Sequence, residues 1–201
     1  MNNIIKIIIE LIGKVFAAQS KPAKEEETFP EFEIIDSTQT LPWHKTRTWS
    51  KRALKSIDKI IVHQELANGT IESVNNYHIT PGPKNSLSPK GAPHFAYHYG
   101  IDLDGSVHKA NPHSATAWHC RGQNSKSVGI MVAGDFSGEG HEGSAEPTAL
   151  QLRNLNLLLD KLLDELNLSN DNIYGHEAFG KPACPGYIVM DEINKRRSQH
   201  E

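Results

Sequence analysis

Histidine and cysteine are the residues most suited to chemistry in this 201-residue chain, which holds eleven histidines and two cysteines. Imidazole and thiolate groups bind zinc, and imidazole also transfers protons near neutral pH. His176 and Cys184 lie eight residues apart, and Gly180 and Pro182 between them can turn the chain back. His63 is a third candidate ligand from a distant segment. Three protein ligands with one open position are typical of catalytic zinc, whereas structural zinc takes four.

Spacing alone leaves a structural interpretation of these residues open. An isolated histidine is more often a surface residue or a hydrogen-bonded core residue than a metal ligand. A single cysteine such as Cys184 is usually a small buried apolar side chain. The choice therefore depends on which elements carry these residues and on the motifs around them.

Two of the three candidates, His63 and His176, lie at the ends of predicted strands. Residues 57–63, IDKIIVH, are rich in β-branched side chains and predict a buried strand that ends at His63. Residues 127–133, SVGIMVA, predict a second buried strand. Ile173-Tyr174 predicts a short last strand directly before His176.

The other segments predict a hairpin, helices and a long loop. Residues 95–103 alternate, Asp104-Gly105 is a hairpin turn, and residues 106–110 return as the partner strand. Residues 80–93 hold four prolines and two glycines and predict an irregular loop that borders the site. Helices are predicted at 69–78, at 147–166 with Pro147 in the first turn, and at 188–197. The order β-α-β-β-β-α-β-α predicts an α/β domain with a mixed β-sheet flanked by helices.

The N-terminal region differs in character from the rest of the chain. In residues 4–16 the charged side chains recur every four residues, so a helix would carry them on one face and apolar side chains on the other. Thirteen residues are too few to span a bilayer. Residues 1–19 are therefore either an export signal or an amphipathic helix that lies on a membrane or on the domain. Residues 20–32 predict a linker, and 33–201 the domain itself.

Composition narrows the class of protein. Hydrophobic residues make up 37% of the chain and charged residues 22%, which is typical of a globular protein with a core of its own. A net charge of −3 argues against nucleic acid as a partner, because phosphate binding needs a basic surface. We expect the protein to be a monomer.

Four motifs occur in a fixed order: IIVHQ at 60–64, AYHYGIDLDGSVHKA at 96–110, AWHCRGQNSKSVGI at 117–130 and YGHEAFGKPACPGY at 174–187. Together they resemble the type-2 family of N-acetylmuramoyl-L-alanine amidases, which includes phage lysozyme-like amidases and peptidoglycan recognition proteins. The resemblance covers roughly residues 50–190. It implies a mixed sheet with a shallow groove, Zn²⁺ as cofactor and the muramyl peptide of peptidoglycan as partner.

The resemblance also implies a set of ligands. The family's metal is held by a histidine after the first strand, a histidine in a Gly-His motif and a cysteine or aspartate before Pro-Gly. In this chain those positions are His63, His176 and Cys184. The cysteine is more similar to the phage and recognition-protein branch than to the cytoplasmic recycling branch, which tends to use aspartate.

Three further residues are candidates for catalysis. Tyr97 matches a tyrosine that faces the zinc in the family and can donate to an oxyanion, although a strand tyrosine can also be a core residue. Phage relatives carry a lysine two residues before the cysteine. Here Pro182 holds that position, and Lys181, one residue further back, either reaches the site or is solvated.

Recycling amidases carry a glutamate in the strand where this chain has Met131. His119 then becomes the candidate that would hydrogen-bond the zinc-held water or the substrate. The alternative is a buried histidine that bridges loops.

Three functions compete. The first is an amidase that cuts between muramic acid and L-alanine, and the second is a recognition module that binds peptidoglycan without cutting it. Non-cutting members usually lack the cysteine, so Cys184 favours the enzyme. The third, a structural zinc domain, would need a fourth ligand, for which Cys120 is the spare thiol. The cell envelope, export and a phage enzyme acting on its host's wall all remain open as locations.

A shortened protein tests the interpretation of the N-terminal region. A chain that starts at Thr28 is expected to fold and to act on soluble muramyl peptides at nearly the full-length rate, because residues 4–16 end well before the first motif. Circular dichroism and the rate of peptide release measure both properties. An insoluble or unfolded product would contradict the prediction and assign residues 4–16 to the core.

Overall fold

A computed structural model describes residues 28–66, 69–138 and 145–198. The predictions for residues 1–19 and for most of 20–32 lie outside the described residues. From Glu31 onward the chain forms one compact unit. None of the helices in the described ranges is long and apolar enough to cross a membrane.

Within these ranges six strands form one mixed sheet in the order β1-β4-β3-β5-β2-β6. The pairing of β3 with β4 is antiparallel, and all the other pairs are parallel. The strands are β1 (Ile34–Asp36), β2 (Lys59–Gln64), β3 (Tyr99–Ile101), β4 (Val107–Lys109), β5 (Ser127–Val132) and β6 (Ile173–Gly175). The helices are α2 (Ile71–Ile79), α3 (Ala149–Leu166) and α4 (Tyr187–Ser198), with short 3₁₀ turns η1 (Leu54–Ser56), η2 (Asn170–Asn172) and η3 (His176–Phe179).

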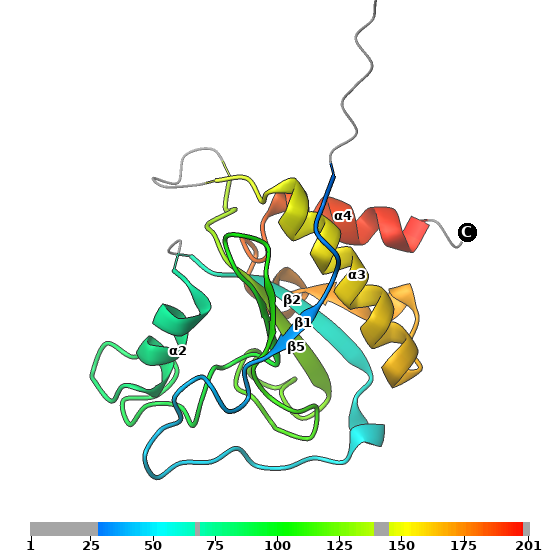
Figure 1. Cartoon of the computed structure of the whole chain (residues 1–201). Coiled ribbons are helices and arrows are strands. Elements are labelled where there is room, and N and C mark those ends of the chain that lie inside the picture. The colour runs from blue at the N-terminus through cyan, green and yellow to red at the C-terminus, as the bar shows by residue number, and fades with distance from the viewer. Residues whose placement is uncertain (1–27, 67–68, 139–144, 199–201) are drawn as a thin grey trace, which may run out of the picture. The chain divides into compact units, whose positions relative to one another are not determined.

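The two faces of the sheet are covered by different helices. Val128 and Ile130 of β5 pack in the main core cluster, which the leucines of α3 and the apolar side chains of α4 complete. Met131 points to the other face and joins a second cluster with Ile71 of α2. Because side chains alternate along a strand, His63, which pairs in register with Met131, faces the α2 side as well. Figure 1 shows α2 on one side of the sheet and α3 and α4 on the other.

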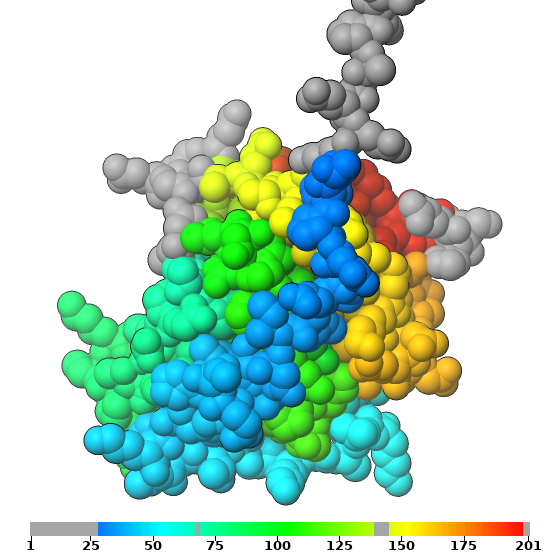
Figure 2. Space-filling model, viewed as in Figure 1, coloured from blue at the N-terminus to red at the C-terminus, as the bar shows by residue number. Residues whose placement is uncertain are grey.

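The sequence predicted most elements, and three details were wrong. β1 was not predicted; it pairs with β4, and the segment that contains it lies on the surface beside α3 (Figure 2). The predicted strand 95–103 is regular only over Tyr99–Ile101, because Ala96 N–H donates to Nδ1 of His78 and not to a neighbouring strand. Pro147 precedes the helix start, which Thr148 caps together with Gln151.

The long loop 80–93 is fixed to the end of α2 by one buried side chain. Nδ2 of Asn85 donates to the carbonyls of Tyr77, His78 and Thr80, and its Oδ1 accepts the N–H groups of two loop residues. The hydroxyl of Tyr77 adds a second connection, since it donates to Lys84 O. This predicted irregular loop is therefore an ordered wall.

Replacing Asn85 tests this account. Asn85→Ala is expected to lower the free energy of unfolding by about 1–3 kcal/mol, because it leaves buried carbonyls without donors. Urea denaturation measures the loss, and hydrogen exchange should rise locally in residues 80–93. Lys84→Ala is the matched control, since that side chain is exposed. An Asn85→Ala protein as stable as the control would refute the anchoring role.

Candidate metal centre

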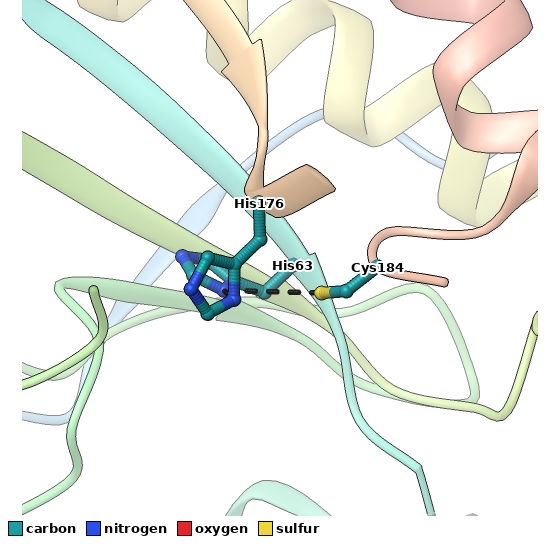
Figure 3. Close-up of side chains that lie close together, drawn as sticks. All are labelled: His63, His176 and Cys184. Atoms are coloured by element: carbon teal, nitrogen blue, oxygen red, sulfur yellow. Dashed lines mark hydrogen bonds between the residues drawn. The ribbon is translucent and has the colours of Figure 1, made fainter. Parts of the chain in front are cut away.

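The three candidate ligands lie together at the C-terminal ends of strands β2 and β6 (Figure 3). Parallel pairing sets Val62 of β2 opposite Gly175 of β6. The residues that follow these two are His63 and His176, which therefore lie side by side. Nδ1 of His63 lies 3.0 Å from Nδ1 of His176 and 3.9 Å from Sγ of Cys184. The three ligand atoms all lie within 4.8 Å of one another.

The turn after η3 brings Cys184 back to the two histidines. Gly180 ends η3 with φ +86°, a left-handed conformation that a side chain would strain. Glu177 N–H then donates to Cys184 O at 2.7 Å, which closes the turn beside His176. The thiol accepts the backbone N–H of Gln64 at 3.4 Å, so the end of β2 holds the sulfur as well as the histidine.

This donor set fits zinc. Bonds of about 2.0–2.1 Å to a tetrahedral zinc separate two nitrogens by about 3.3 Å, close to the 3.0 Å observed between the histidines. Burial, with the nearby His119 and His176, lowers the pKa of His63 well below its usual value. Burial, with Lys181, lowers the pKa of His176 to about 4. Both imidazoles are therefore neutral, which is the form that binds metal.

The thiol responds to the same burial in the opposite sense. Burial raises the pKa of Cys184 to about 11, so a nearby cation is needed to stabilise its thiolate. A divalent metal supplies that charge. Two neutral imidazoles and one such thiol are the donor set that a soft divalent cation would take.

Gln64 supports the site and was not identified from the sequence. This buried side chain donates from Nε2 to Ala183 O at 2.5 Å and to Ser137 Oγ at 3.0 Å. Its Oε1 accepts the Phe136 N–H. The end of β2 is thereby joined to the cysteine loop and to the segment after β5. Its position directly after a candidate ligand was the one signal available in the sequence.

A groove of about 530 Å³ lies beside the ligand cluster. It is lined by Gln64, whose N–H donates to Cys184, and by Tyr97, whose ring lies against His63. Helix α2 forms a wall with Ser73 and His78, and Ser86 belongs to the anchored loop. The rings of Tyr97 and His63 lie 5.0 Å apart between centroids. Burial, with the charges of Cys184 and Glu65, raises the pKa of Tyr97, so its phenol stays protonated and can donate.

The structure separates the remaining candidates. His119 lies behind His63, with Nδ1 at 3.0 Å from Nε2 of His63, and burial lowers its pKa to about 3. Lys181 is exposed, and its charge is the second cause, after burial, of the lowered pKa of His176. Cys120 is buried and unpaired, and the metal-binding group found in the described part of the chain does not include it.

The fold and the site define a class: a mixed-sheet α/β domain with a His-His-Cys cluster of candidate metal ligands beside a groove. The family model for N-acetylmuramoyl-L-alanine amidase matches residues 52–187. The chain belongs to this family.

Individual relatives agree with this assignment. The chain is 29% identical over 127 residues to peptidoglycan-recognition protein SC1a of Drosophila melanogaster and 30% identical over 91 residues to the endolysin of Klebsiella phage KP32. These matches cover 63% and 45% of this chain, and 61% and 58% of the two relatives.

Solved structures share the fold. The amidase LysC from Clostridium intestinale URNW has a TM-score of 0.61 at 21% identity, covering 83% of this chain and 97% of that chain. Peptidoglycan recognition protein-LE, solved in complex with tracheal cytotoxin, has a TM-score of 0.62 at 20% identity, covering 81% of this chain and 92% of that chain.

Replacing the candidate ligands tests the metal site. His63→Ala, His176→Ala and Cys184→Ala are each expected to lower zinc content well below one ion per chain, because each removes one of three ligands. Elemental analysis measures the content, and chelation should lower the melting temperature of the wild type. Cys120→Ala is the matched control for the cysteine. A Cys184→Ser protein with full zinc occupancy would remove Cys184 from the ligand set.

Proposed function

We propose that the chain is a zinc-dependent amidase that hydrolyses the bond between N-acetylmuramic acid and the L-alanine of the peptidoglycan stem peptide. The observation that carries the proposal is the cluster of His63, His176 and Cys184 beside a groove lined by Tyr97. The family assignment supports the same chemistry. The similar protein of Klebsiella phage KP32 is named an endolysin, and LysC is named an N-acetylmuramoyl-L-alanine amidase.

Each part of the site has a role in this reaction. A bound zinc ion supplies Lewis-acid chemistry, polarising a carbonyl and activating water at neutral pH. His63, His176 and Cys184 would hold it, and the groove would take the peptide on one side of the scissile bond. Hydrolysis adds a water oxygen to the carbonyl carbon and breaks the C–N bond, and the released alanine amine takes up a proton.

Tyr97 contributes a hydrogen bond where negative charge develops. Its phenol remains protonated in the groove beside His63, so it can donate to the carbonyl oxygen as that oxygen becomes an oxyanion. Lys181 is a candidate for a further positive charge, since its charge acts on both His176 and Cys184.

A recognition module is the second candidate function. The similar Drosophila proteins are named for peptidoglycan recognition, and the solved LE protein holds tracheal cytotoxin, a monomeric peptidoglycan. A module of this kind would use the same groove and would not cut the amide. Retention of Cys184 as a third ligand favours the enzyme.

The products of digestion separate these functions. Purified peptidoglycan treated with the protein is expected to gain N-terminal alanine without new reducing sugars, because an amidase leaves the glycan strand intact. Mass spectrometry of the soluble fragments and a reducing-end assay measure the two products. Binding without released peptide would favour the recognition module, and new reducing ends would indicate a glycosidase.

Removing one hydroxyl tests the role of Tyr97. Tyr97→Phe is expected to lower the turnover number by about 10²–10³ and to leave substrate affinity nearly unchanged, as for one oxyanion donor. The variant keeps the ring that contacts His63, so zinc content should stay at the wild-type level. Tyr187→Phe, at an exposed tyrosine, is the control. Unimpaired Tyr97→Phe turnover would assign oxyanion stabilisation to another group, with Lys181 next to test.

A further inference from the structure

Behind His63 lie two buried polar side chains, His119 and Ser127, followed by the backbone carbonyl of the half-buried Gln123. Its Nε2, the ring nitrogen that faces away from His176, lies 3.0 Å from Nδ1 of His119. Nε2 of His119 lies 3.1 Å from Oγ of Ser127, and that hydroxyl donates to Gln123 O at 2.9 Å. The two imidazoles are 1% and 6% exposed, so water does not compete for the contact between them.

The Gln123 carbonyl, at the end of this series of hydrogen bonds, fixes the position of each proton. A carbonyl only accepts, so the Ser127 hydroxyl must donate to Gln123 O and its oxygen then accepts from His119. His119 therefore carries its proton on Nε2 and presents a lone pair at Nδ1. A neutral imidazole has one donor and one acceptor nitrogen, so His63 must donate from Nε2 and keep a lone pair on Nδ1. That nitrogen is the one beside His176 and Cys184.

Strand β5 is shaped to seat the His119 ring. Ser127 and Gly129 lie two residues apart and so face the same side of the strand. A Cβ at position 129 would lie 2.4 Å from Cγ of His119, nearer than a real Cβ atom approaches another atom. Glycine is required there because the imidazole occupies the space that a side chain would fill.

We propose that His119 is a positioning residue that, with Ser127, fixes His63 in the tautomer and orientation able to bind a metal through Nδ1. This assigns His119 an indirect role in place of the contact with water or substrate that the sequence suggested. Partners of this kind, behind a metal ligand, commonly alter metal affinity by about 10–100-fold when removed. The inference rests on the ligand role of His63 in the proposed function.

Zinc affinity is the first test. His119→Ala should weaken zinc binding by about 10–100-fold, measured by competition with a chromophoric chelator. His119→Asn should recover much of that loss, because its Oδ1 lies near the former Nδ1 and can accept from His63. Gly129→Ala should also weaken binding, although residue 129 is not a ligand, since the added methyl displaces the ring.

Two controls separate this effect from damage to the fold. His113→Ala removes a half-buried histidine that bonds to the hydroxyl of Tyr99 and should leave zinc affinity unchanged. The melting temperature of each metal-free variant shows whether the domain still folds. The inference is overturned if His119→Ala binds zinc as the wild type does, or if His119→Asn is no better than His119→Ala in folded proteins.

A spectroscopic measurement tests the tautomers without metal. In the metal-free full-length protein, the ¹⁵N chemical shifts of His63 and His119 should identify both as Nε2–H forms. An Nδ1–H form of His119 would overturn the inference. A wild type that binds zinc but releases no alanine would contradict the amidase and leave the role of His119 standing. Wild-type zinc affinity in His119→Ala would overturn the role of His119 and leave the amidase standing. A wild type that binds no zinc would overturn both.

Discussion

The register between β2 and β6 is the constraint on which the site depends. Pairing Val62 with Gly175 brings the two strands to a common edge, where each continues into a histidine. Neighbouring strands lie about 4.8 Å apart, so side chains that leave one edge can converge on one point. A shift of one residue in β2 would turn His63 to the opposite face, into the apolar cluster under α3 and α4.

Burial of the cluster sets its chemistry. Desolvation keeps His63 and His176 neutral and favours the protonated thiol of Cys184, so these groups lack a compensating charge of their own. A cation that binds there replaces lost hydration and stabilises the thiolate. The buried polar atoms behind the ligands need partners as well, and Gln64 and His119 supply them.

The two faces of the sheet carry different parts of the molecule. Leucines of α3 and the apolar side chains of α4 pack on one face and form most of the core. The other face carries α2, the groove and the ligand cluster. This second face has many buried polar groups, and specific hydrogen bonds such as those of Asn85 give it a fixed shape.

The sequence by itself determined the central elements and the candidate ligands. β-branched runs marked β2 and β5, and the four motifs identified the family together with the candidate ligands His63, His176 and Cys184. These features are local, because strand and helix periods and motif spacing are written along the chain. Tertiary structure decided what those residues contact. The anchoring by Gln64, the position of His119 behind His63 and the need for glycine at 129 arise between segments far apart in sequence, and no local pattern encodes the register and side-chain directions that bring them together.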